Sequence, residues 1–373
     1  MNRANQTVVE AAHRQGFALV GFALLRRLDE RDDFYRRWLQ DGRHGAMEYL
    51  ALGPERRIDP RTLDARFKSI VSLAYPYAPP QTAAATSIDW RAQMRGRIAA
   101  YALGRDYHDY VLNAACAVAE AIADARPGAI TRAYVDTGPV FEREWAAAAR
   151  LGWFGKNTML LNRDQGSYFF LAEIFTDAEF EPSREPYREH CGTCRRCLDL
   201  CPTGALADGY VMESRLCISY QTIENRGAIP VALRPKLANW IFGCDVCNEV
   251  CPWNGDASSE VNSKDLIPFL PDLLALDEGS FSRRFTGSAV KRAKRRGLLR
   301  NVAVALGNTR NPDAVSALAR SLDSEKEPLV RAHAAWALGQ IGGVDARRVL
   351  EAARARESDD SVLAEIRAAR KII

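Results

Sequence analysis

Short apolar runs separated by helical patterns characterise the first 180 or so residues. Apolar positions recur at helical spacing in stretches such as 111–125. Four runs have the length and composition of β-strands: 17–22, 69–75, 130–135 and 168–175. Strands and helices that alternate along one stretch predict an α/β or α+β body. The breaker-rich stretch 78–87 predicts an exposed loop.

The pattern changes from residue 298 onward, where the chain becomes alanine-rich and helical. The segment 301–307 (NVAVALG) returns 32 residues later at 333–339 (HAAWALG). Helix pairs that repeat at this interval resemble short HEAT-like repeats. Two repeats are fewer than the three or more usually needed to stand alone, so we expect this module to dock on the rest of the chain.

Composition places the chain among ordinary folded proteins. Its 373 residues are 47% hydrophobic and 26% charged, enough for at least one large core and two or three domains. No run reaches 18 apolar residues and the N-terminal stretch lacks a leader pattern, so we expect a cytoplasmic protein without a membrane segment. A net charge of +4 does not by itself indicate a nucleic-acid partner.

Cysteine placement changes this picture. Eight of the nine cysteines fall between Cys191 and Cys251, whereas Cys116 stands alone in an apolar helical stretch. Free thiols in such number, in a reducing compartment, favour ligation of a metal or cluster over disulfides. For Cys116 we predict a place in the core.

The cysteines fall into two sets, each closed by a Cys-Pro pair. The first, Cys191-x2-Cys194-x2-Cys197-x3-Cys201-Pro202, matches the bacterial ferredoxin pattern, in which the fourth cysteine ligates the other cluster. The second consists of Cys217, Cys244, Cys247 and Cys251. This exchange predicts two 4Fe-4S clusters, one on Cys191, Cys194, Cys197 and Cys251, the other on Cys201, Cys217, Cys244 and Cys247. Two four-cysteine zinc sites are the alternative, but zinc motifs lack the tandem Cys-Pro closure.

Three further segments carry a family resemblance: Gly-Arg-Asp-Tyr-His at 104–108, Tyr-Val-Asp-Thr-Gly-Pro-Val-Phe-Glu-Arg at 134–143 and Leu-Gly-Trp-Phe-Gly-Lys-Asn at 151–157. With the paired cysteine sets and the helical tail, they resemble the epoxyqueuosine reductase family over most of the chain. The resemblance implies a cobalamin bound between the body and the clusters. It also implies two-electron reduction of epoxyqueuosine to queuosine at the wobble position of tRNA, with the oxygen leaving as water.

The implied architecture has three parts. Residues 1–180 would form an α/β (α+β) cobalamin-binding catalytic body. Residues 181–260 would form an inserted ferredoxin-like domain with two 4Fe-4S clusters, and residues 261–373 a basic segment with HEAT-like repeats for tRNA.

By the same resemblance, Asp136 matches the family's proton donor. A carboxyl group can donate near neutral pH only where burial or a neighbouring anion raises its pKa. The alternative is that Asp136 ends a strand and caps the turn at Gly138.

The family resemblance also implies cobalamin contacts at five positions of this chain: Arg57, Asp136, Ser219, Asp245 and Val246. His108 is not assigned to cobalt, because Val111 stands where the cobalt-histidine signature Asp-x-His-x-x-Gly requires glycine. Its role stays open, as do those of Lys156 and Asn157.

The segment between Arg283 and Arg300 holds eight basic residues and no acid. A solvated helix face is one interpretation; binding to tRNA is the one we favour, because the run leads into a repeat module. The family resemblance implies a tRNA with a GUN-type anticodon, a low-potential electron donor and a monomeric enzyme. A corrinoid enzyme similar to reductive dehalogenases and a noncatalytic electron carrier are the alternatives.

Overall fold

The computed structural model describes residues 2–77, 88–184, 188–206, 208–255 and 267–372. The loop predicted at 78–87 lies outside them. The chain divides into two compact units of three stretches each. The body unit consists of Met1–Ala78, Asp106–Ser214 and Val246–Ala257, and the repeat unit of Pro79–Arg105, Arg215–Asp245 and Ser258–Ile373.

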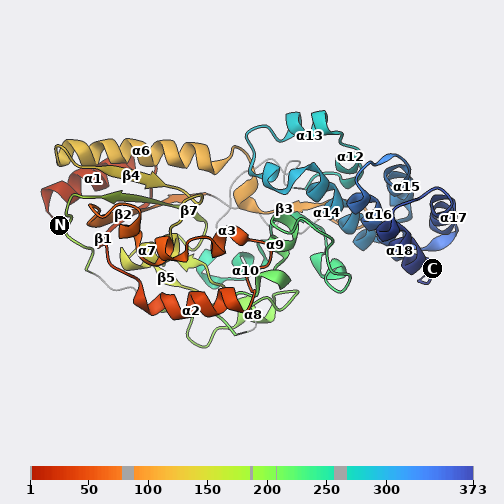
Figure 1. The fold of residues 1–373 in the computed structure, drawn as a ribbon, viewed down its shortest axis with the longest axis horizontal. Coiled ribbons are helices and arrows are strands. Elements are labelled where there is room, and N and C mark those ends of the chain that lie inside the picture. Colours follow the sequence, from red (N-terminus) through yellow and green to blue (C-terminus); the bar gives the residue numbers. More distant parts are fainter. Residues whose placement is uncertain (1, 78–87, 185–187, 207, 256–266, 373) are drawn as a thin grey trace. The chain divides into compact units, whose positions relative to one another are not determined.

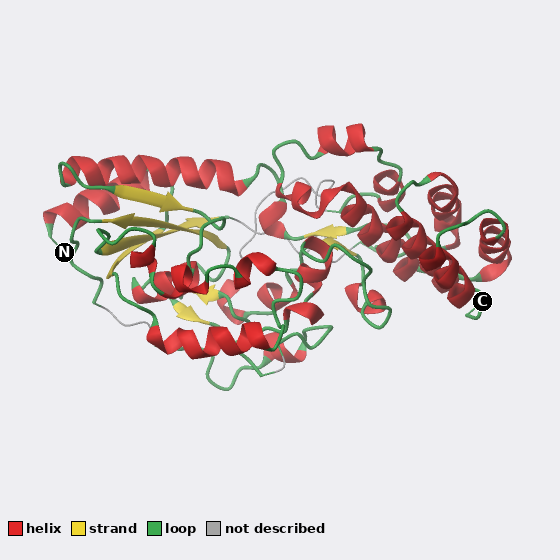
Figure 2. Ribbon diagram, in the orientation of Figure 1, coloured by secondary structure: helices red, strands yellow, loops and turns green. Residues whose placement is uncertain are grey.

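A four-stranded antiparallel sheet, in the order β1-β2-β7-β4, forms the centre of the body unit (Figures 1 and 2). Its strands are β1 (Leu19–Leu24), β2 (Ser69–Pro76), β4 (Thr131–Tyr134) and β7 (Phe169–Thr176). All four runs predicted as strands therefore belong to this one sheet, and the antiparallel pairing makes the body α+β.

Helices cover both faces of the sheet. On one face, α1 (Arg3–Arg14) packs against α6 (Tyr107–Ala125); on the other, α7 (Glu142–Ala148) packs against β1, β2 and β7 (Figure 1). The core under α7 is apolar and includes Trp145, which has no exposed surface. The remaining helices and strands of the body unit are α2 (Asp29–Gln40), α3 (Glu48–Ala51), α4 (Pro54–Ile58), β5 (Trp153–Phe154), β6 (Leu160–Leu161), α8 (Arg196–Asp199) and α10 (Val246–Glu249).

Cys116 does not lie in the core, so that prediction was wrong. Helix α6 buries the stripe that contains Val111, Ala115 and Val118, and the Cys116 thiol is exposed. Neighbouring helix positions point about 100° apart. Cys116 lies outside the buried stripe and is therefore turned out to solvent, although the surrounding sequence is apolar.

The repeat unit is mostly helical. It contains a short parallel pair, β3 (Arg97–Ile98) and β8 (Trp240–Phe242), beside α9 (Ile218–Ile223). The other α-helices among its described residues are α12 (Leu270–Leu274), α13 (Glu278–Arg284), α14 (Lys294–Thr309), α15 (Val315–Ser324), α16 (Pro328–Ile341), α17 (Gly343–Arg354) and α18 (Asp360–Ala369). Helices α14, α16 and α18 pack in sequence as one row, and α15 and α17 pack against them and against each other (Figure 1).

Two glycines set the distance between helices of this row. A Cβ on Gly307 would stand 2.8 Å from Ala337 Cα, and one on Gly339 would stand 2.9 Å from Ala369 Cα. Both contacts follow the predicted 32-residue register, which continues into α18. The helical repeat is thus confirmed and includes a third row helix that the sequence comparison did not identify. Among the described residues, no helix has the length and apolar character needed to cross a membrane.

Candidate functional site

Asp136 lies in the turn that follows β4, with a left-handed backbone (φ 55°). Aspartate tolerates this conformation better than most residues. Its Oδ2 accepts hydrogen bonds from the Tyr107 hydroxyl at 2.9 Å and from His108 Nε2 at 3.1 Å. Its backbone N–H donates to Glu142 Oε1 at 2.5 Å. Both the carboxyl group and the backbone of Asp136 are therefore held by neighbouring side chains.

His108 is held between two carboxylates at the start of α6. Its Nδ1 lies 2.7 Å from Oδ1 of Asp106, the N-cap of that helix, while Nε2 bonds to Asp136. The hydrogen bond to Asp136, assisted by the one to Asp106, raises the pKa of His108 to about 9 against the effect of burial. At neutral pH the imidazolium donates from both nitrogens. The sequence left the role of His108 open, and the structure shows that it donates a hydrogen bond to Asp136.

Stacked rings fix the donors to Asp136. The Tyr107 ring stacks on Phe170 of β7, with centroids 4.2 Å apart and an angle of 5° between the planes, and on His108 at 4.1 Å. Side-chain positions set by packing lose little entropy when they bind a substrate. The sheet therefore positions the two donors.

Arg57, near the end of α4, reaches the same turn. Its Nη1 donates to Gly138 O at 3.3 Å. Its Nε is buried and has no hydrogen-bond partner within the described residues. A buried guanidinium nitrogen without an acceptor leaves a donor for an external polar group, such as an amide or a phosphate.

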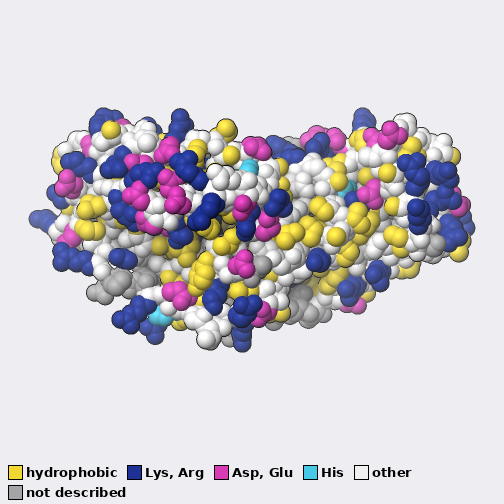
Figure 3. All heavy atoms as spheres, turned by 60° about the horizontal axis from the view of Figure 1, so that its bottom comes forward, with side chains coloured by type: hydrophobic (Ala, Val, Ile, Leu, Met, Phe, Trp, Pro, Cys, Tyr) yellow, Lys and Arg dark blue, Asp and Glu magenta, His cyan; other side chains and the backbone are white. Residues whose placement is uncertain are grey.

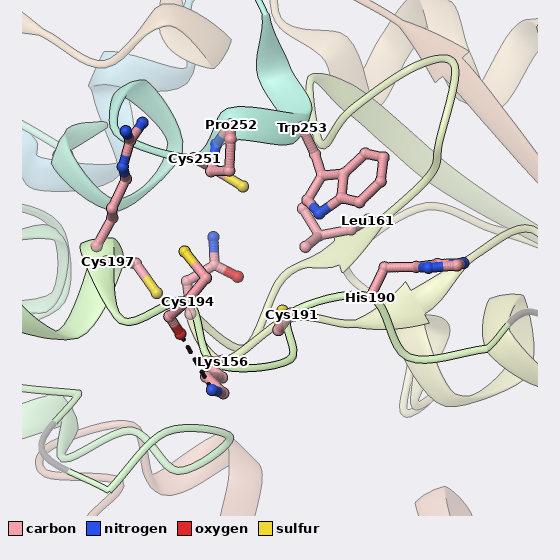
Figure 4. A pocket seen from close by; sticks show the side chains of 11 residues that line it. Lys156, Leu161, His190, Cys191, Cys194, Cys197, Cys251, Pro252 and Trp253 are labelled. Atoms are coloured by element: carbon pink, nitrogen blue, oxygen red, sulfur yellow. Dashed lines mark hydrogen bonds between the residues drawn. The ribbon is translucent and has the colours of Figure 1, made fainter.

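Four cysteines line one cavity of about 240 Å³ in the body unit (Figure 4). They are Cys191, Cys194, Cys197 and Cys251, the set that the ferredoxin exchange predicts for one cluster. Burial, with the neighbouring thiols, raises the pKa of Cys197 to about 11. Four thiolates so close together require cationic compensation, which iron provides. The donor set therefore fits a cluster.

Lys156 and Asn157, whose roles were open, brace the loops around this cavity. Lys156 Nζ donates to the carbonyl oxygen of Cys194 at 3.0 Å (Figure 4) and to that of Gly192 at 2.5 Å. Asn157 Nδ2 donates to Cys247 O at 3.4 Å. Both side chains thus connect the turn after β5 to cysteine-bearing segments.

Aromatic rings stand at one side of the cavity. Trp153 and Trp253 meet edge to face, with centroids 5.2 Å apart, and His190 lies 4.9 Å from Trp153. Trp253 and His190 line the cavity itself (Figure 4). Apolar rings beside a cluster limit its contact with water, which is one determinant of its potential.

The second predicted cysteine set is distributed over both units. Cys201 and Cys247 belong to the body unit; Cys217 and Cys244 belong to the repeat unit. All four are half-buried. Cys217 caps the N-terminus of α9 and Cys247 lies on α10.

The other predicted cofactor contacts lie beside these cysteines. Ser219 is on α9, half-buried, and Val246 begins α10. Asp245 is buried, and its Oδ2 accepts the Ala100 N–H at 2.6 Å. Ala100 and Asp245 both belong to the repeat unit, so this hydrogen bond fixes the carboxylate of Asp245 within that unit.

The basic segment between Arg283 and Arg300 does not form one uniform face. Arg300 is buried and donates to the carbonyl oxygens of Gln221, Asn225 and Gly227. Arg295 forms an ion pair with the half-buried Glu325, and Arg292 makes two hydrogen bonds to Glu224, at 2.9 and 3.0 Å. These three arginines hold the repeat unit together. The exposed members that form no ion pair within the described part of the chain are Arg283, Arg284 and Lys294.

Sequence reasoning missed two features. Further basic side chains gather where α17 and α18 end the repeat row (Figure 3), and the exposed ones include Arg347, Arg348, Arg354 and Arg367. Helical spacing scatters them along the sequence, so no run marks them. The carboxyls of Glu142 and Glu173, close to Asp136 and to each other, were also missed. An acid inside the apolar run 168–175 was the available signal for Glu173.

Comparisons with known families match three segments of the chain. Residues 57–137 match the model described as "Epoxyqueuosine reductase QueG, DUF1730". Residues 190–254 match a 4Fe-4S double cluster binding domain, and residues 288–370 match HEAT repeats. The first segment contains Asp106, His108 and Asp136; the second contains all eight clustered cysteines.

Curated relatives match over nearly the full length. The epoxyqueuosine reductase of Pseudomonas aeruginosa is 39% identical over 348 residues, which cover 91% of this chain and 95% of that protein. The epoxyqueuosine reductase of Escherichia coli K12 is 36% identical over 347 residues, covering 91% and 90%.

Solved structures of epoxyqueuosine reductases are similar to this chain over nearly its full length. A crystal structure of epoxyqueuosine reductase with an epoxyqueuosine-modified tRNA-Tyr stem loop has a TM-score of 0.89 at 30% identity and covers 98% of both chains. The Bacillus subtilis epoxyqueuosine reductase with its catalytic aspartate loop swung out of the active site has a TM-score of 0.87 at 28% identity, covering 99% and 98%.

Proposed function

This chain belongs to the epoxyqueuosine reductase family, and we propose that it reduces epoxyqueuosine to queuosine at the wobble position of tRNA. The observation that carries the proposal is the clamped carboxyl group of Asp136, which Tyr107 and His108 hold from one side. This group lies in the segment that matches the family model. We infer that Asp136 donates a proton to the epoxide oxygen.

Two 4Fe-4S clusters supply the electrons. We assign one to Cys191, Cys194, Cys197 and Cys251, on the evidence of their common cavity and the crowding of their thiols. We assign the other to Cys201, Cys217, Cys244 and Cys247, on the ferredoxin exchange. A low-potential carrier is the proposed electron donor.

Cobalamin is the proposed cofactor, and when bound it supplies the cobalt that reduces the epoxide. The unpartnered Nε of Arg57 supports a polar group of the cofactor beside the Asp136 turn. We assign Ser219, Asp245 and Val246 to the cofactor as well, because they adjoin the cysteines of the second set.

The chain's own residues have separate tasks in the reaction. His108 and Tyr107 orient the carboxyl group of Asp136 so that its proton can reach the oxygen. Breaking both C–O bonds of the epoxide and forming the alkene consumes two electrons and two protons, and the oxygen leaves as water. Proton donation is most effective where the donor is already in position.

The substrate is a tRNA, and we propose one with a GUN-type anticodon, bound by a monomer in the cytoplasm. The relative that contains an epoxyqueuosine-modified stem loop supports this choice. Single-stranded anticodon loops expose bases that a protein can capture, and exposed basic side chains of the repeat unit would contact phosphates.

Anaerobic turnover tests the proposal: reconstituted protein, cobalamin, a low-potential reductant and tRNA that carries epoxyqueuosine. Formation of queuosine that depends on cobalamin is expected. Cobalamin binding with no affinity for tRNA would favour a small-molecule corrinoid enzyme instead, and failure to bind cobalamin would favour an electron carrier.

A further inference from the structure

A buried carboxyl group lies on the sheet face that α7 covers. Glu173, in the middle of β7, has no exposed surface and pairs with Ser72 of β2 and Tyr134 of β4. One of its oxygens accepts a hydrogen bond from Ser72 Oγ at 3.3 Å. The other, Oε2, has no hydrogen-bond partner within the described residues. Its same-face neighbour Phe175 belongs to the apolar core.

An ionised carboxylate is costly in such a layer, because burial removes its hydration. Burial and the nearby charge of Glu142 raise the pKa of Glu173 well above its usual range. Both effects favour the protonated form of Glu173. A glutamine could make the Ser72 contact without a titratable group, so the distinctive property of a carboxyl here is that proton.

Glu142 is linked to the Asp136 turn by a hydrogen bond and to Glu173 by the interaction of their charges. It is the first residue of α7, is partly buried, and accepts the Asp136 N–H at its Oε1. Burial, and the charge of Asp136 when that group is ionised, raise the pKa of Glu142 to about 8. Besides Asp136, the charged groups that act on Glu142 are Arg143 and His108; Glu142 is the charged group that acts on Glu173.

We propose that Glu142 and Glu173 store the second proton of the reaction and return it to Asp136. This role rests on the proposed function. Asp136 gives the first proton to the epoxide oxygen as a C–O bond breaks and becomes a carboxylate. Glu142 then reprotonates Asp136, which gives the second proton to the departing hydroxide to form water. Glu173 in turn reprotonates Glu142, and Asp136 and Glu173 then each regain one proton from solvent.

The test follows single turnover of the reduced holoenzyme with epoxyqueuosine tRNA across pH. Glu173→Gln is expected to lower the rate by about 10²-fold near pH 9, where solvent protons are scarce, and to stay near the parent rate at about pH 6. Glu144→Gln is the matched control. It removes a carboxylate of the same helix that forms an ion pair with Arg31 at 2.5 Å, and should leave the profile unchanged.

A purely structural role would reduce the rate by one factor at every pH, and that result would overturn the proposal. A loss at high pH in His108→Gln but not in Glu173→Gln would assign the second proton to His108 and overturn it as well.

Infrared spectra provide a readout that is independent of turnover. Cluster-loaded parent protein at neutral pH should show the C=O stretch of buried protonated carboxyls, and Glu173→Gln should lose the component that belongs to Glu173. No difference between them would refute the stored proton even in an active enzyme. A clear band in a parent protein that fails to convert epoxyqueuosine would instead locate the failure in the proposed function and remove the delivery step.

Discussion

His108 Nε2 lies 3.1 Å from Oδ2 of Asp136, and the same imidazole meets Asp106 through its other nitrogen. One ring thus connects the N-cap of α6 to the turn after β4. Because it is bonded to a carboxylate at each nitrogen, it favours the charged form. The protonation state of this ring therefore sets the electrostatic environment of Asp136.

Asp136→Asn is expected to slow single-turnover epoxide reduction by about 10²- to 10⁴-fold, the usual range for a positioned general acid. The amide preserves the shape of the side chain and removes the proton. Iron content, cobalamin binding and tRNA affinity, measured on the same preparation, should match the parent. A parental rate would show that the proton comes from elsewhere.

The His108 imidazolium should stabilise the fold in a pH-dependent way. Its pKa is raised from 6.5 to about 9, so its contribution is complete below the lower value and is lost as pH rises through the upper one. With a side chain 31% exposed, screening reduces this contribution to about 1 kcal/mol. Denaturant titrations of the parent and His108→Gln, at about pH 6 and about pH 10, measure it. A difference that does not shrink with pH would contradict the ion-pair origin.

Each cluster should depend only on its own set of four cysteines, so a substitution in one set should remove one cluster and leave the other. Reconstituted protein is expected to bind about eight irons, and Cys194→Ser should remove roughly half of them. Cys116→Ser, on the exposed face of α6, is the control and should leave iron unchanged. Stoichiometric zinc in place of iron would reject the assignment.

Affinity for tRNA should depend on the exposed basic residues rather than on the whole run. Neutralising Arg283, Arg284 and Lys294 should lower the magnitude of the slope of log affinity against log salt by about two units, at roughly 0.7 to 0.9 per lost phosphate contact. Arg295→Met is the contrasting variant. It breaks the pair with half-buried Glu325 and should lower the melting temperature. An unchanged slope in the triple variant would make these residues ordinary surface.

The close helix contacts predict opposite effects for two glycines of α14. Gly307→Ala should destabilise the protein by about 1–3 kcal/mol, because the new methyl would meet the backbone of Ala337. At Gly297 the nearest atom to a new Cβ is Ala293 Cβ, at 3.8 Å. Gly297→Ala should therefore stabilise the helix by about 0.5–1 kcal/mol. Equal effects, measured by thermal unfolding, would rule out the packing explanation.

The sequence predicts well those features that depend on local pattern. The four strands of the body sheet were predictable because each is a short apolar run, and the cysteine sets because their spacing is specific. The 32-residue register was visible because Gly307 and Gly339 occupy equivalent close contacts.

Features that depend on long-range contacts were not predictable. The packing of α7 on the sheet brings Glu142 and Glu173 into interaction. Arg295 of α14 forms an ion pair with Glu325, which follows the next helix, α15. Nor does the pattern show which basic residues are buried, as Arg300 is. The boundaries 1–180, 181–260 and 261–373 stay a prediction, since both compact units consist of non-consecutive stretches.

The cavity shared by Cys197 and Cys251 has a consequence for assembly of the protein. A cluster bound there ties together two cysteines separated by roughly 50 residues of chain, and so acts as a cross-link that closes a long loop. Closing such a loop restricts the unfolded chain much as a disulfide does. Iron insertion should therefore be coupled to folding of everything between these cysteines, and protease sensitivity of that stretch would report whether a preparation has received its cluster.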